Sequence, residues 1–138
     1  KMYEADMKRP RIQHVSIPRP PGAGSREQAR AFFGGLLGVA EKPVPSTIEH
    51  LDLVWFDLGE ATELHVFSEP PLDDRSGRHF CLEVDDVAEL RARLVAAGFA
   101  PWEPETINNR PRFFCRDPFG NTLEFTTILG DYADPRAS

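Results

Sequence analysis

The chain has 138 residues, 16 basic and 22 acidic side chains, and a formal net charge of −6. This acidic balance argues against a nucleic-acid or anionic-membrane partner, and no apolar run reaches the ~18 residues that a membrane helix needs. The length suits one domain or two tightly joined half-domains. Two cysteines, Cys81 and Cys115, are too few for a secreted disulfide framework, so we expect a cytoplasmic protein.

The first half of the chain predicts a strand, a helix and three further strands. The polar residues 1–10 are expected to form a tail, and the first strand follows at 11–17 (RIQHVSI). The helix is predicted to start at Ser25 as N-cap, with Gln28 completing a capping box, and to end at Gly38. The three strands that follow are expected at about 39–44, 50–58 and 62–68.

The second half repeats this order after a linker at 69–77. A strand is predicted at 79–84, and a helix follows with Asp86 as N-cap and Gly98 as its end. The distance from cap to glycine is 12 residues here (86 to 98) and 13 in the first half (25 to 38), which indicates an internal repeat. The remaining strands are expected at about 99–104, 111–116 and 121–127, with a tail at 129–138. The predicted fold is therefore α+β, with two βαβββ modules at 11–68 and 78–128.

Four of the predicted strands each carry one side chain that can bind a metal ion: His14, His65, His79 and Glu124. The separations are 51 (14 to 65), 14 (65 to 79) and 45 residues (79 to 124), so two similar long arms flank a short bridge. An unpaired imidazole or carboxylate is costly to bury in an apolar strand. A shared metal ion would remove that cost.

The alternation of side chains along a strand supports one common site. Glu63, His65 and Phe67 share a face, and Cys81 shares a face with His79. We predict that Phe67, Cys81, Arg112 and Phe113 contact the substrate. Cys81 and Cys115 are expected on strands that flank the 121–127 strand, which makes a disulfide between them unfavourable.

Two stretches, HFCLEVDDVAELRARLVAAGF and RPRFFCRDPFGNTLEFTTI, resemble the second module of the vicinal oxygen chelate superfamily, which includes glyoxalases, bleomycin-resistance proteins and extradiol dioxygenases. The resemblance implies a cleft between paired sheets, with one metal ligand on the first and last strand of each module. Those positions are His14 and His65 in one module and His79 and Glu124 in the other. The resemblance also implies a site formed across a homodimer, whereas the residues alone leave open whether the partner sheet is in the same chain. His65 stands where glyoxalase I has Glu.

Imidazole nitrogens with one carboxylate suit a divalent Zn, Fe(II), Ni, Co or Mn ion better than Ca or Mg. Such an ion polarises a substrate that offers adjacent oxygens, and Glu124, or alternatively Glu63, would accept a proton as general base. This chemistry favours a glyoxalase-like lyase or isomerase acting on a small molecule. The alternatives are an antibiotic- or metabolite-binding resistance protein, a thiol transferase of the fosfomycin-resistance type that uses His14, His79 and Glu124, and an extradiol dioxygenase.

Overall fold

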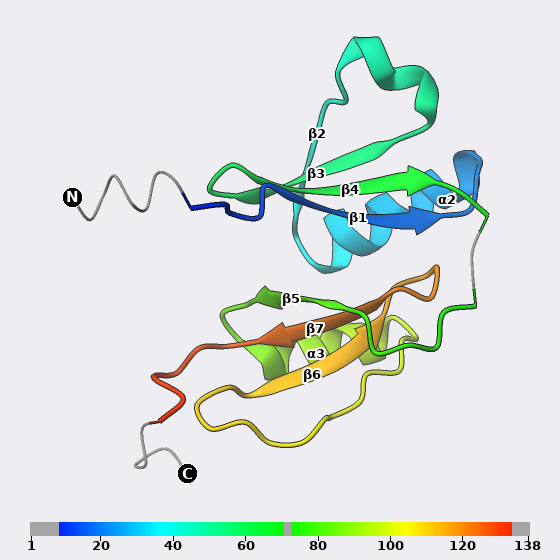
Figure 1. Cartoon of the computed structure of the whole chain (residues 1–138). Coiled ribbons are helices and arrows are strands. Elements are labelled where there is room, and N and C mark those ends of the chain that lie inside the picture. The colour runs from blue at the N-terminus through cyan, green and yellow to red at the C-terminus, as the bar shows by residue number, and fades with distance from the viewer. Residues whose placement is uncertain (1–8, 71–72, 134–138) are drawn as a thin grey trace.

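The computed structural model describes residues 9–70 and 73–133, which form two small sheets with a helix on each (Figure 1). Residues 1–8 and 134–138 of the predicted tails, and positions 71–72 of the predicted linker, lie outside the described residues. The elements of the first half are β1 (His14–Arg19), α2 (Ala23–Ala29), the π-helix η1 (Arg30–Leu36), β2 (Ala40–Lys42), the 3-10 helix η2 (Ser46–Leu51), β3 (Val54–Gly59) and β4 (Thr62–Ser68). Those of the second half are β5 (Phe80–Glu83), α3 (Val87–Ala96), β6 (Arg112–Arg116) and β7 (Thr122–Thr126).

The strand order confirms the predicted repeat. The first sheet has the order β1-β4-β3-β2, and the second has the order β5-β7-β6. In each sheet the first and last strands of the half are parallel neighbours, and the last two strands are antiparallel neighbours. Trp102 forms a bridge with Phe114 on the far side of β6 and so takes the place that β2 has in the first sheet.

Two predicted strands are shorter than expected, for local chemical reasons. The strand expected at 99–104 is reduced to the Trp102 bridge, because Pro101 and Pro104 on either side cannot donate a backbone hydrogen bond to a ladder. The strand expected at 50–58 begins only at Val54, since 46–51 forms a 3-10 turn and Asp52 adopts a left-handed conformation with φ of 60°.

The two helices start differently, although the sequence predicts a side-chain cap for both. Asp86 caps α3 as predicted, and its carboxylate accepts a hydrogen bond from the backbone N–H of Glu89. The prediction for Ser25 is wrong: α2 begins at Ala23 after Gly22, and no side chain caps it. Ser25 lies inside the first turn, and its hydroxyl donates to the carbonyl oxygens of Pro20 and Gly22.

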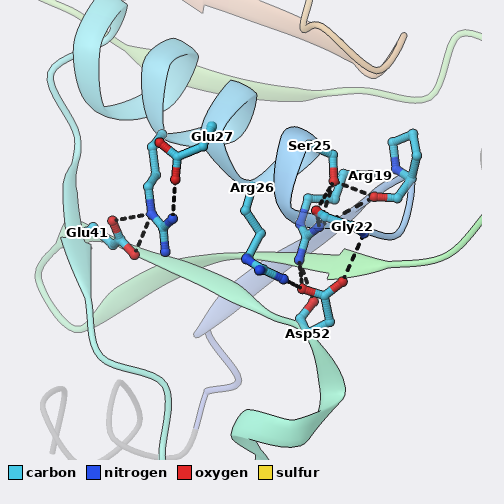
Figure 2. A network of polar contacts seen from close by, with 9 residues as sticks. Arg19, Gly22, Ser25, Arg26, Glu27, Glu41 and Asp52 are labelled. Atoms are coloured by element: carbon cyan, nitrogen blue, oxygen red, sulfur yellow. Dashed lines mark hydrogen bonds and ion pairs between the residues drawn. The ribbon is translucent and has the colours of Figure 1, made fainter.

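A buried ion-pair network holds the start of α2 in place of a cap, as Figure 2 shows. The Arg19 side chain is fully buried, and its guanidinium donates to the Ser25 hydroxyl at 2.7 Å and to the Asp52 carboxylate at 2.7 Å. Arg26 donates to the same carboxylate, and so does the backbone N–H of Gly22 at 3.3 Å. The network therefore ties β1, the first turn of α2 and the end of η2 together.

The two halves share one hydrophobic core. Each sheet has the helix of its own half beside it (Figure 1), and the buried side chains of both halves form one cluster. Between the halves, the rings of Phe32 and Phe99 lie 5.0 Å apart, edge to face, and Arg93 donates to the carbonyl oxygen of Leu36. The Asn121 side chain donates to the carbonyl oxygen of Pro18 at 2.9 Å. These contacts position the turn after β6 against the end of β1.

Candidate metal and substrate site

The first sheet carries a stack of three rings on the face opposite its helix. In β4, Leu64 and Val66 are fully buried in the core, so His65 points to the other face as the alternation predicts. The His65 ring lies 3.8 Å from the Trp55 ring at 2° and 4.1 Å from the His14 ring at 17°. Trp55 is the direct neighbour of His65 across the β3–β4 ladder. The structure thus brings His14 and His65 together, and Trp55 stacks on the same His65 ring.

Glu63 lies beside this stack and uses both of its carboxylate oxygens. One oxygen lies 2.8 Å from Nε2 of His65, and the other accepts from Lys42 at 2.5 Å. The hydrogen bond from Lys42, followed by that from His65, lowers the pKa of Glu63 to about 2. A carboxylate with so low a pKa is a weak proton acceptor. The low pKa therefore argues against Glu63 as the alternative general base.

The second sheet joins His79, Glu124 and Arg112 at the equivalent place. Nε2 of His79 lies 3.0 Å from one oxygen of Glu124, and Arg112 donates to the other oxygen at 3.0 Å. Only 9% of the Glu124 surface is exposed. His79 precedes β5, and Glu124 is in the middle of β7, the parallel neighbour of β5. The chemistry-bearing side chains of the second half therefore meet on the face away from α3.

The aromatic residue that lines this face is Phe114 and not Phe113. Phe113, which the sequence predicts to contact the substrate, is 2% exposed and stacks on Phe125 in the core, so it does not lie on the face that carries Glu124. Phe114 is the ladder neighbour of Glu124 and lies edge to face with His79 at 4.8 Å. Alternation could have found it, because Arg112 and Phe114 share a face of the strand and Phe113 cannot.

The remaining predicted contact residues lie as strand alternation expects. Phe67 is half-buried on the His65 face of β4. Cys81 is exposed on β5, where it is the ladder neighbour of Glu124, whereas Cys115 is buried in β6. The two cysteines flank β7 and are both free, as predicted.

The four predicted ligands thus form two pairs, one on each half. Within residues 9–70 and 73–133 of one chain, no three His, Cys, Asp or Glu side chains form a group that could hold a metal ion. The edge strands β1 and β5 border the same two cavities, of about 420 and 1020 Å³, and both Val15 and His79 line each of them. Of the four predicted donors, only His79 is among the residues that line these two cavities.

The donor chemistry of each pair fits a divalent ion. Nδ1 of His79 lies 2.8 Å from the carbonyl oxygen of Gly77, which can only accept a hydrogen bond, so Nδ1 carries a proton. Nε2 then faces the Glu124 carboxylate, and the two atoms need a cation or a second proton between them. His79 and Glu124 would supply one nitrogen and one oxygen to an ion, and His14 and His65 would supply two nitrogens. A mixed nitrogen and oxygen set of this kind suits transition metals and Zn²⁺.

Comparison with known proteins places the chain in one family. The model of the Glyoxalase/Bleomycin resistance protein/Dioxygenase superfamily matches residues 11–125. The chain belongs to this superfamily. The match confirms the resemblance found in the sequence, which is carried by the ligand-bearing strands and the DPFGN turn. A search of curated proteins finds no match.

Solved structures of the superfamily share the fold over nearly the whole chain. A glyoxalase family protein from Bacillus anthracis is 28% identical, with a TM-score of 0.75, and the alignment covers 86% of this chain and 95% of that one. The antibiotic-binding protein TnmS3 from Streptomyces is 23% identical, with a TM-score of 0.65 and coverage of 88% and 98%. The lactoylglutathione lyase from Agrobacterium tumefaciens is 22% identical, with a TM-score of 0.61 and coverage of 87% and 95%. An enzyme and an antibiotic-binding protein therefore share this architecture.

No helix in the described part of this superfamily member is long and apolar enough to cross a membrane.

Proposed function

We propose that the chain is a metal-dependent lyase or isomerase of the glyoxalase superfamily that acts in the cytoplasm on a small substrate with adjacent oxygen atoms. The observation that carries the proposal is the contact between His79 and Glu124, matched by the contact between His14 and His65 on the equivalent strands of the other half. Each half thus places two metal donors together at the same place of a repeated unit, and in each pair one donor, His65 or Glu124, is largely buried and needs a polar partner.

Each residue of the two pairs has a role in this proposal. His14, His65, His79 and Glu124 would hold the ion, which would supply Lewis-acid polarisation of a substrate oxygen when bound. Glu124 would also accept a proton from carbon next to a carbonyl group. Arg112, which holds one Glu124 oxygen, orients this carboxylate and offers positive charge to an anionic substrate. Phe114, Phe67 and Cys81 would contact the body of the substrate.

A homodimer would bring the two pairs into one site. One chain supplies two donors from each half, and no group of three in its described part is close enough to hold an ion. β1 and β5 are edge strands, since each is paired with a single neighbour in the described sheets. We propose that the His14–His65 pair of one copy faces the His79–Glu124 pair of a second copy.

Metal titration of protein without an affinity tag tests the site. Calorimetry with Zn²⁺, Co²⁺ and Ni²⁺ should show one bound ion per chain. Each of the substitutions His14→Ala, His65→Ala and His79→Ala should weaken metal binding at least about tenfold. His50→Ala is the matched control, because His50 lies in η2 and is exposed. Equal losses in the His50 variant, or no binding by the parent protein, would contradict the proposal.

Glu124→Gln separates metal binding from turnover. Gln keeps the shape and one ligand oxygen but loses the charge and the basicity. We expect a modest loss of metal affinity and no turnover of a hemithioacetal or of another substrate found by screening the metal-loaded protein. Turnover that survives in Glu124→Gln would remove Glu124 from the role of base.

Mixing two inactive variants distinguishes a site within one chain from a site between copies. If two copies build the site, His65→Ala and His79→Ala proteins that exchange subunits should regain part of the metal binding, because one site of the mixed dimer contains only native donors. If each chain builds its own site, the mixture should bind no better than the separate variants.

A second candidate function is the binding of an aromatic antibiotic or metabolite without turnover. Its support is the aromatic row on the second sheet, in which Trp102 and Phe114 stack at 5.6 Å with Arg116 over the Trp102 ring. A binding protein should keep its affinity for such a ligand in Glu124→Gln. A thiol transferase of the fosfomycin-resistance type would use only His14, His79 and Glu124, so His65→Ala should leave its metal affinity unchanged.

A further inference from the structure

We propose that Glu63 is a positioning residue that decides which ring nitrogen of His65 is offered to the metal ion. This inference rests on the proposed metal site and assigns Glu63 a role different from that of a base. Glu63 is two residues before His65 on β4, so both side chains project from the same face of the strand. The inference starts from what each histidine nitrogen contacts.

Each of the three candidate histidines has at least one ring nitrogen within hydrogen-bond distance of an oxygen atom, and His79 has an oxygen beside both. Nδ1 of His14 lies 2.8 Å from the side-chain oxygen of Gln13, and Nδ1 of His79 lies 2.8 Å from the carbonyl oxygen of Gly77. These two rings therefore donate through Nδ1 and leave Nε2 for an ion. His65 is the reverse case, because its Nε2 lies 2.8 Å from Glu63. A metal-binding histidine is commonly oriented in this way by a hydrogen bond at its other nitrogen.

Glu63 is placed to accept a hydrogen bond from Nε2 of His65, and its own position is fixed by a second contact. Its second oxygen accepts from Lys42, which fixes the direction of the carboxylate. The side chains of Glu63 and His65 are 15% and 13% exposed, so little water competes for the contact. The His65 ring is also held between Trp55 and His14, which prevents it from tilting. Nδ1 is then the nitrogen of His65 that carries a lone pair.

The tautomer can be measured in protein that contains no metal. Long-range ¹H–¹⁵N correlation spectra of histidine-labelled protein, recorded above pH 8, show which nitrogen of each neutral ring carries the proton. We expect His65 to be protonated at Nε2, with a ring proton protected from solvent, and His14 to be protonated at Nδ1. Single histidine substitutions assign the four signals. A wild-type His65 protonated at Nδ1 would overturn the inference without any Glu63 variant.

Glu63→Leu removes the acceptor, and Glu41→Leu is the matched control. Glu41 also lies on the first sheet and is paired with a basic side chain, Arg30, but contacts no histidine. We expect Glu63→Leu to lose the protected His65 proton and to weaken metal binding ten- to a hundredfold, whereas Glu41→Leu should change neither. Unchanged His65 signals and affinity in Glu63→Leu would refute the positioning role. If no variant and no parent binds metal, the proposed function fails, but the protected proton and its loss in Glu63→Leu still decide whether Glu63 positions His65.

Discussion

The two halves of the chain hold the start of their helix by different means. In the second half a single exposed side chain, Asp86, caps α3 through one hydrogen bond. In the first half α2 has no side-chain cap, and the fully buried Arg19 pairs instead with Asp52, which is 33 residues further along the chain. Loss of the single Asp86 cap should therefore reduce the stability of the fold only slightly. The buried network joins three segments, and loss of Asp52 would leave the buried Arg19 guanidinium without its anionic partner.

The difference follows from the residues between strand and helix. The second half has a short connection from β5 to Asp86, whereas the first half has the Pro- and Gly-rich stretch PRPPGAGS. A helix that begins after glycine in an extended, positive-φ conformation, as Gly22 does at 119°, has no side chain at its N-cap. The backbone N–H at the start of the helix then needs an acceptor from elsewhere in the fold, and the Asp52 carboxylate provides it for Gly22.

Asp52→Ala should produce the largest loss of stability among substitutions that test this comparison. It leaves the Arg19 guanidinium fully buried without its anionic partner, which costs about 3–5 kcal/mol in comparable cases. The free energy of unfolding from urea titration measures the effect. Asp73→Ala is the control, because Asp73 pairs with Arg75 at the surface, and we expect it to change stability by less than about 0.5 kcal/mol. Equal effects of the two substitutions would show that the network contributes little.

The turns that join the last two strands of each half provide a second contrast. Asp57 accepts one backbone hydrogen bond, from Gly59, at an exposed turn. Asp117 is 4% exposed and accepts from the N–H groups of Phe119 and Asn121. Burial raises the pKa of Asp117 to about 6, although hydrogen bonds from Asn121 act in the opposite direction.

Stability should therefore depend on pH through Asp117. The folded-state pKa lies above the value near 3.8 of the unfolded chain, so the folded protein binds more protons between about pH 4 and pH 6. Its free energy of unfolding should fall as the pH rises through this window, by up to about 3 kcal/mol. Urea titrations at pH 4, 5, 6 and 7 measure the slope. Asp117→Asn should flatten it and Asp57→Asn should preserve it; a slope that persists in Asp117→Asn would assign the titration to another group.

The smallest expected effect is that of Asp86→Ala. Loss of a helix N-cap costs about 1 kcal/mol, because the N–H of Glu89 is exposed and water can replace the carboxylate. The same urea titration measures it. A loss as large as that of Asp52→Ala would mean that the two halves depend equally on their helix starts, which the structure argues against.

Much of the fold could be predicted because it follows from patterns between near neighbours. The alternation of Leu64 and Val66 with His65, the cap at Asp86 and the stop at Gly98, which has φ of 94°, all depend on a few consecutive residues. Repetition of these patterns in two halves was enough to indicate the βαβββ order. Alternation also placed His65 and Glu124 on the faces away from the helices.

The tertiary structure decided the features that depend on distant partners. Ser25 has the residue type of a cap, but Arg19 and the carbonyls before α2 use its hydroxyl, because Asp52 is brought beside them by the fold. The sequence likewise indicated four metal donors, whereas the structure shows that they pair within each half. The contacts of Glu63 on which its proposed role rests also depend on the tertiary structure, since Lys42, 21 residues earlier, is placed beside it by the β2–β3–β4 sheet. Short-range order is determined by local sterics and polarity, but the partner of a buried charge is determined by which segments the core packs together.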